Sequence, residues 1–148
     1  MGGHDKKLRE FEGELQRHAN EVGLHFDFTK MIPANTQHAH RLAKLMAHYN
    51  LEYQFTEALM AGHFIEGQDL ADDHYLYDVV ESLGVARHEA MSVREKSVYS
   101  EQLEQDCYDA QQIGVESAPF FVFDNRFGII GAESIAVFER TIQQVLQT

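Results

Sequence analysis

Cys107 carries the most nucleophilic side chain of this 148-residue sequence, and it is the only cysteine. A single cysteine excludes a disulfide bond within the chain, a Cys-rich zinc site and a self-contained Cys-x-x-Cys redox centre. Cys107 lies on the apolar stripe of a predicted helix, and unpaired cysteines are among the residues most often buried. We therefore predict that Cys107 is a small buried residue, and we assign no catalytic residue to the chain.

Nine histidines are the next candidates for chemistry, because neutral imidazole is a common metal ligand. His38 and His40 are two positions apart in a predicted helix, so their side chains point about 200° apart and do not share a metal ion. The run Asp72-Asp73-His74 fits a helix N-terminus, where carboxylates interact favourably with the helix dipole. We predict no metal and no cofactor. A metal or small-ligand binder stays open as an alternative that rests on the histidine count.

The formal net charge is −12, and the acidic excess is concentrated in residues 66–109, which hold 12 acidic and 3 basic residues. A negative field repels a phosphate backbone, so we expect no nucleic-acid partner. Solvated helical faces explain the acidic segment best, and a docking surface for a basic partner is the alternative. No apolar run approaches the roughly 18 residues of a membrane span, and the first residues are polar. We therefore expect no membrane partner and a cytoplasmic location.

Apolar residues recur at helical spacing through the first 113 residues. Thr36 is placed to cap one predicted helix, and Asp72 or Asp73 is placed to cap another. Apolar and polar residues alternate over 24–28, which predicts a short extended stretch. The predicted helices cover residues 8–22, 36–49, 55–66, 73–83, 86–91 and about 99–113.

The pattern changes after residue 113. Phe120–Phe123 is a continuous apolar run, typical of a strand that is buried on both faces. A turn over 124–127 and a second strand over 128–132 complete a predicted antiparallel hairpin. Helical spacing returns over 135–146. The sequence therefore predicts an α+β chain that is mostly helical.

The first strand of the predicted hairpin has only one neighbouring strand. Two strands are marginally stable in water, and a wholly apolar strand usually needs a partner on each side. The sequence supplies one partner. We therefore predict a homodimer, or an assembly with another protein chain, in which the partner covers the strand edge formed by Phe120, Phe121, Val122 and Phe123.

Three segments carry motifs that occur together in one known family. They are Val115-Glu116-Ser117-Ala118-Pro119-Phe120-Phe121-Val122-Phe123 with the later Gly131-Ala132-Glu133, Ala34-Asn35-Thr36-Gln37-His38-Ala39-His40-Arg41-Leu42, and Ala61-Gly62-His63-Phe64-Ile65-Glu66-Gly67. In order and spacing they resemble the DsbA-like thioredoxin-fold family, and most closely its FrnE-like subgroup. The likeness runs from about Leu8 to Val145. Ala118 and Glu133 depart from it, since the subgroup usually has Val and Gln there.

The resemblance implies a partial DsbA-like thioredoxin fold, with a helical insertion domain followed by a β-hairpin and a C-terminal helix. We expect one incomplete domain over residues 1–148, made of a helical part (5–113) and a ββα part (114–148). The resemblance places His40 and Arg41 in the packing of the helical insertion and gives them no chemistry.

The resemblance also implies a substrate-binding role for Ala118 and Pro119. Pro119 would be the cis-proline that opens the strand, and the backbone beside it would pair with an extended polypeptide substrate. The alternative is an ordinary trans proline at the start of a strand.

The family's N-terminal strand–helix–strand, which carries Cys-x-x-Cys at a helix start, has no counterpart in this sequence. We expect that a longer protein has been cut or that the gene encodes only the remainder. The implied function is that of a thiol–disulfide oxidoreductase family member that lacks its redox cysteine pair in this chain and is inactive alone. The alternative is a non-enzymatic protein-binding or homo-oligomeric module that uses strand 120–123.

Overall fold

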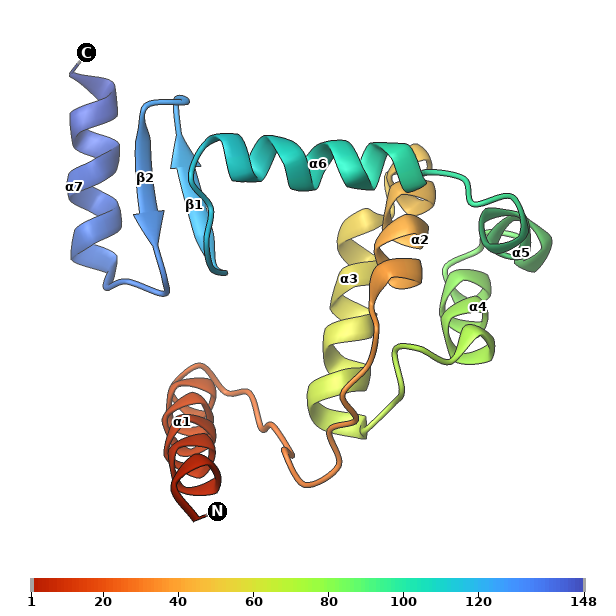
Figure 1. Cartoon of the computed structure of the whole chain (residues 1–148), viewed down its shortest axis with the longest axis horizontal. Helices are drawn as coiled ribbons and strands as arrows, with labels where there is room; N and C mark the ends of the chain where they lie inside the picture. Colours follow the sequence, from red (N-terminus) through yellow and green to blue (C-terminus); the bar gives the residue numbers. More distant parts are fainter. Residues whose placement is uncertain (1, 148) are drawn as a thin grey trace. The chain divides into compact units, whose positions relative to one another are not determined.

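The computed structural model describes residues 2–147, and the chain divides into two compact units, 1–103 and 104–148. The division falls inside helix α6 (Ser100–Gln112) (Figure 1). The first unit holds α1 (Gly2–Glu21), α2 (Gln37–His48), α3 (Glu52–Ala61), the π-helical turn η1 (Gly62–Glu66), α4 (Asp73–Ser82), α5 (Arg87–Glu95) and the start of α6. The second holds the rest of α6, β1 (Phe120–Phe123), β2 (Phe127–Ile130) and α7 (Ile135–Leu146).

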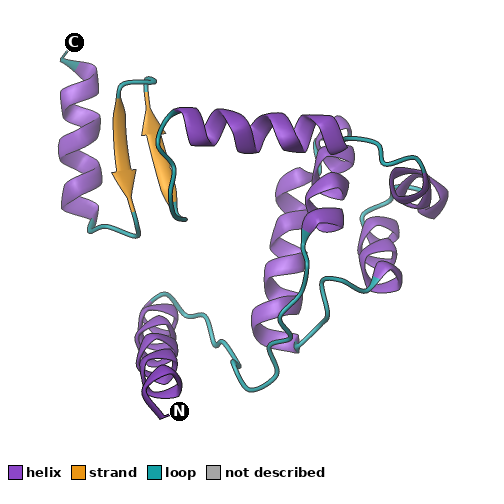
Figure 2. Cartoon of the chain, viewed as in Figure 1, coloured by secondary structure: helices purple, strands orange, loops and turns teal. Residues whose placement is uncertain are grey.

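The predicted fold class is confirmed, because the described chain is mostly helical and has one two-stranded sheet (Figure 2). Three helices differ in extent from their predictions. α1 begins at Gly2 rather than near residue 8, and the last turn of the helix predicted over 55–66 is the π-helical η1. The predicted turn over 86–91 is the first part of α5, which continues to Glu95 because Ala90 and Val93 bury its inner face. The predicted extended stretch at 24–28 is irregular and joins no sheet in the described residues.

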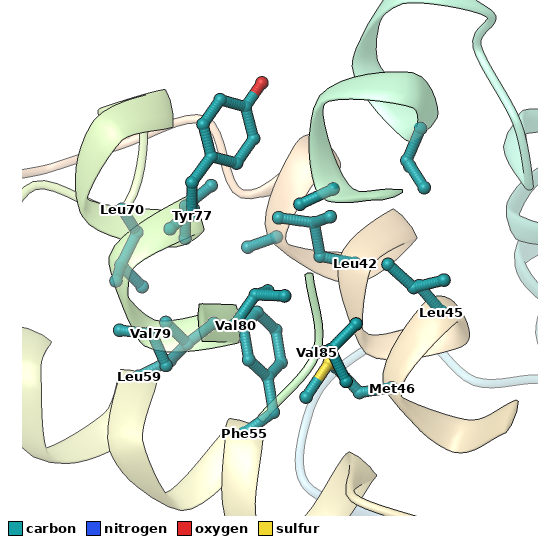
Figure 3. Close-up of a cluster of buried hydrophobic side chains, with 14 residues drawn as sticks. Leu42, Leu45, Met46, Phe55, Leu59, Leu70, Tyr77, Val79, Val80 and Val85 are labelled. Carbon is teal, nitrogen blue, oxygen red and sulfur yellow. The ribbon is translucent and has the colours of Figure 1, made fainter. Parts of the chain in front are cut away.

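The hydrophobic core of the first unit lies among α2, α3, α4 and α5 (Figure 3). Apolar residues repeat at the i, i+3 and i+4 positions of an amphipathic helix, so each helix turns one apolar stripe inward. Complete burial of a Leu or Phe side chain contributes about 1.5–3 kcal/mol, so this cluster is the main stabilising feature of the unit. The five largest fully buried side chains are Phe55, Leu42, Met46, Leu76 and Val80.

Two helix N-termini illustrate how local sequence fixes the element boundaries. The Asp72 carboxylate accepts a hydrogen bond of 2.9 Å from the His74 N–H and caps α4, as predicted. Thr36 occupies the N-cap position of α2 but its side chain makes no capping hydrogen bond, because its backbone is not extended (φ −89°, ψ 6°). The Asn35 side-chain oxygen instead accepts the Gln37 N–H at 3.0 Å.

Glycines bound the π-helical turn that follows α3. A Cβ at Gly62 would overlap the Tyr75 hydroxyl, so this close approach requires glycine. Gly67 ends the turn with φ +75°, where its backbone packs against Lys30. Phe64 lies between the two glycines, where its ring stacks on Phe26 at 4.8 Å between centroids and its C=O accepts the Asp27 N–H at 2.7 Å.

In the second unit, β1 and β2 pair in antiparallel register, from Phe120 opposite Ile130 to Phe123 opposite Phe127. Asp124 and Asn125 take positive φ angles (51° and 52°) in the turn, which Asp and Asn tolerate better than most residues. The hairpin predicted from the sequence is thus confirmed.

α7 covers one face of this hairpin. The Phe138 ring packs edge-on against Phe121 at 4.9 Å and Phe123 at 6.2 Å between ring centroids. The prediction that β1 is buried on both faces is wrong for this chain, since Phe121 and Val122 are 39% and 44% exposed. The physical reason is that the described residues give the sheet only two strands and one covering helix.

Candidate functional site

Ala118 and Pro119 lie directly before β1, and the peptide bond between them is cis. The Pro119 C=O accepts a hydrogen bond of 2.8 Å from the Gly131 N–H, which ties this bend to the end of β2. Within the described residues, the backbone N–H and C=O of Ala118 have no backbone partner. The bend is therefore fixed on one side and leaves open hydrogen-bonding groups on the other. Its role in substrate binding stays a prediction.

The outer edge of β1 continues from this bend. The sheet order is β1–β2, so one edge of β1 has no strand beside it in residues 2–147 (Figure 2). An unpaired edge presents N–H and C=O groups that are spaced to pair with another extended chain. The residues predicted to form an oligomer edge, Phe120, Phe121, Val122 and Phe123, are the residues of this strand.

The sheet face opposite α7 is also open. Side chains alternate along a strand, so Phe120 and Val122 lie on the face away from Phe121 and Phe138. They line a hollow of about 160 Å³ together with Phe127 and Ile113. The Phe120 ring lies over Gly128, where a Cβ would be 3.0 Å from the ring. The unit therefore has both a free strand edge and a partly apolar sheet face.

Cys107 lies on α6 and is exposed. The prediction of a buried residue is wrong, because none of the described side chains of α6 is buried. Apolar residues do recur at helical spacing along α6, but they are too few to bury the helix. The chain has no second thiol, so Cys107 cannot form a disulfide within the chain.

A family model described as the DSBA-like thioredoxin domain matches residues 2–143. The chain belongs to the DsbA-like thioredoxin family. The crystal structure of a probable DsbA oxidoreductase from Streptomyces coelicolor is similar, with a TM-score of 0.89 and 24% sequence identity. The likeness covers 96% of this chain and 62% of that one, so this chain spans less than two thirds of that protein. At this identity the likeness shows the fold. No curated protein matches the chain.

This DsbA-like chain also contains a buried polar cluster in its first unit, which the sequence did not predict. His38 and Arg41 of α2 are buried. The Arg41 guanidinium donates to His38 Nδ1 at 3.3 Å, and a guanidinium only donates, so His38 carries its proton on Nε2. That Nε2 lies 3.9 Å from Asp73 Oδ1, and the other oxygen of Asp73 pairs with Arg94 Nε at 3.1 Å.

The cluster holds His38 in its neutral form. Burial lowers the pKa of His38 to about 4; Asp73 opposes this, and the charges of Arg41 and Arg94 add to it. His38 Nε2, Arg41 Nε and Asp73 Oδ1 are buried without a hydrogen-bond partner. Because the cluster joins α2, α4 and α5, it positions helices of the DsbA-like helical part. The sequence signal was the three-residue spacing of His38 and Arg41 beside the apolar stripe of α2.

The metal binder that the histidine count left open as an alternative finds no assembled ligand cluster among the described residues. In the described part of this DsbA-like chain, no three His, Cys, Asp or Glu side chains lie close enough together to hold a metal ion. His38 is buried in the polar cluster, whereas His40, on the same helix, is exposed. Among the helices of residues 2–147, none has both the length and the apolar character to span a membrane.

Proposed function

We propose that this chain supplies the polypeptide-binding part of a thiol–disulfide oxidoreductase of the DsbA-like family, in its FrnE-like subgroup. Family membership over residues 2–143 and the open strand edge that begins at Ala118 and Pro119 support the proposal. An extended substrate would pair with the backbone of Ala118 and continue along β1, since strand addition uses unpaired main-chain groups in this way.

Thiol–disulfide exchange, the reaction of this family, needs two thiols on the enzyme. A thiolate attacks a substrate disulfide, a mixed disulfide forms, and a second thiol displaces the substrate thiolate while a new disulfide closes. This chain has only Cys107, so the attacking pair would have to come from other polypeptide. The chain alone is therefore expected to be inactive.

Reduction of insulin by dithiothreitol tests this expectation, because released insulin chains precipitate and are followed by turbidity. We expect the chain to leave the background rate unchanged, and Cys107→Ser to behave identically. Turnover well above background that survives Cys107→Ser would contradict the proposed inactivity, because the chain holds no other cysteine.

The second candidate is a binding module without enzymatic activity. The observation that favours it is the free edge of β1 together with the exposed apolar side chains Phe121 and Val122. We propose that a second copy or another protein chain covers this edge. Light scattering at micromolar concentration is expected to show an assembly, and a stable monomer would contradict this candidate.

Val122→Lys places a charge on the open face of β1 and is expected to dissociate that assembly or disrupt the hairpin. Gln143→Lys is a matched control, because residue 143 is an exposed position on α7. An assembly that tolerates Val122→Lys as well as it tolerates Gln143→Lys would show that the edge is not the contact.

Two further predictions stay untested. The cytoplasmic location is a prediction that cell fractionation would check. Metal binding as an alternative function has no supporting cluster in the described residues. Metal analysis of protein purified without a metal-affinity column would detect it.

A further inference from the structure

One buried arginine joins α2 to the junction between α5 and α6. The Arg41 guanidinium donates to the Val93 C=O near the end of α5 and to Ser100 Oγ at the start of α6, each at 3.5 Å. Both bonds are at the long end of the hydrogen-bond range, so the contact is a weak one. The same guanidinium donates to His38 Nδ1 at 3.3 Å. The position of Arg41 therefore depends on His38, which lies one turn earlier on the same helix.

The link between α5 and α6, residues 96–99, has a strained backbone. Ser97 and Tyr99 have φ angles of 51° and 66°, in the left-handed region that residues other than glycine seldom adopt. The Ser100 N–H reaches the Ser97 C=O at 3.2 Å, which is also long. A strained segment persists only where its surroundings hold it. Arg41 is one of the groups that hold this link, because it bonds to the helices on both sides of it.

Protonation of His38 would disturb this arrangement. A protonated imidazole carries an N–H on both nitrogens, so Nδ1 could no longer accept the Arg41 N–H, and two cations would face each other. Burial is the main cause of the lowered pKa of His38, which is about 4; Asp73 of α4 opposes it, and Arg41 and Arg94 of α5 add to it. Tyr77 of α4, whose ring lies edge-on to His38, stays uncharged, since burial raises its pKa.

We propose that His38 and Arg41 form an acid-sensitive switch at the start of α6. When His38 takes up a proton, the Arg41 guanidinium leaves its two acceptors, and the strained link lets the first turn of α6 separate from α2. The closed form keeps His38 buried and neutral, whereas the open form exposes it to water. The opening equilibrium therefore rises by about 25-fold between pH 7 and pH 5, from a pKa of 6.5 in the open form and about 4 in the closed form.

Hydrogen exchange of backbone amides in the full chain, recorded by NMR at pH 7 and pH 5, tests the switch. Protection factors correct for the effect of pH on the chemical exchange rate and report the opening equilibrium. The Leu103 N–H is the probe, because it bonds to the Tyr99 C=O in the first turn of α6. We expect its protection factor to fall by about 25-fold between pH 7 and pH 5. An unchanged protection factor would overturn the proposal.

Urea at low concentration separates this local opening from unfolding of the whole unit. A local opening exposes little surface, so urea scarcely promotes it, whereas urea promotes global unfolding strongly. We expect the Leu103 N–H to exchange faster than the slowest amides of α3 and with a much weaker dependence on urea. The same urea dependence at Leu103 and in α3 would mean that only global unfolding exposes this amide, and would overturn the proposal.

His38→Gln removes the group that takes up the proton. We expect the protection factor of Leu103 to change by less than about twofold between pH 7 and pH 5 in this variant. His48→Gln is the matched control, because His48 is exposed on the same helix and its ring lies 5.4 Å from the Tyr99 ring of the link. It is expected to keep the full response. A response that persists in His38→Gln, or that disappears in His48→Gln, would overturn the proposal.

Ser100→Ala tests the other end of the contact and leaves His38 in place. It removes one acceptor of the Arg41 guanidinium. We expect the protection factor of Leu103 at pH 7 to fall by about two- to fivefold, the size of one weak hydrogen bond, and the response to pH to stay near 25-fold. Unchanged protection at pH 7 would show that Arg41 does not hold the start of α6, and would overturn the proposal.

Discussion

The two units of this chain are stabilised in different ways. The first has a cluster of 14 buried hydrophobic residues supplied by four helices and the loops that join them, whereas Ile129 is the one buried hydrophobic residue among those described in 104–148. The second unit instead exposes apolar side chains on β1 and α7, including Ile135 and Leu146. The local sequence of the second unit favours the hairpin and α7, but these elements bury little of their apolar surface against each other. The second unit therefore leaves most of its apolar surface exposed among the described residues, whereas the first unit buries its own.

The largest test of this difference compares truncations of apolar side chains in the two units. Phe55 is fully buried, so Phe55→Ala is expected to lower the free energy of unfolding by about 3–5 kcal/mol. Leu146 is 80% exposed, and Leu146→Ala is expected to change it by less than about 0.5 kcal/mol. Urea unfolding followed by far-UV circular dichroism measures both. Comparable losses of stability would show that Leu146 is buried in solution. The two units would then not differ in how far they bury their apolar side chains.

The next test is the pH dependence of the first unit. The folded pKa of His38 is about 4 and its ordinary value is 6.5, so below pH 6.5 the unfolded chain takes up a proton that the folded chain does not. Folding stability is thus full above pH 6.5 and is lost as the pH falls towards 4, by on the order of 3 kcal/mol. Urea midpoints between pH 7 and 4 measure this loss.

His38→Gln is the control for that measurement, because glutamine has no charge to gain over this range. Carboxylates titrate in both proteins, so the difference between them isolates His38. We expect a shallower decline in stability with falling pH in His38→Gln. Parallel declines would mean that His38 is solvated in the folded chain.

A smaller effect is expected at the N-terminus of α4. Asp72→Ala removes the carboxylate that accepts the His74 N–H and is expected to cost about 1 kcal/mol. Asp72→Asn retains a side-chain acceptor and is expected to stay within a few tenths of a kcal/mol of the native chain. Thermal or urea unfolding measures both. Equal losses in the two variants would attribute the effect to charge rather than to the cap.

The smallest effect is expected in the second unit at Cys107. The thiol is exposed on α6, so Cys107→Ser is expected to change stability by less than about 0.5 kcal/mol. Reaction of the thiol with Ellman's reagent in the folded chain is expected to be complete within minutes. A thiol that does not react, or a large loss of stability, would show that α6 is buried in solution. It would then identify α6 as part of the surface that a partner contacts.

Sequence reasoning was reliable where a local signal decides the structure. The hairpin at 120–130 follows from a β-favouring apolar run and residues that tolerate positive φ, and the α4 cap follows from the acceptor at Asp72. It failed where burial depends on distant partners. Cys107 and β1 were predicted to be buried because their neighbours in sequence are apolar, but burial needs a surface to pack against.

The sequence by itself determined where the helices and the hairpin lie along the chain, the presence of a single thiol and the motifs that are typical of the DsbA-like family. Each of these depends on residue type or on spacing along one helix or strand. Only the tertiary structure decided that His38 and Arg41 are buried together beside Asp73, and that residues of α2, α3 and η1 line one apolar hollow. These features depend on which helix faces meet, and helix faces meet through the packing of residues that are distant in the sequence.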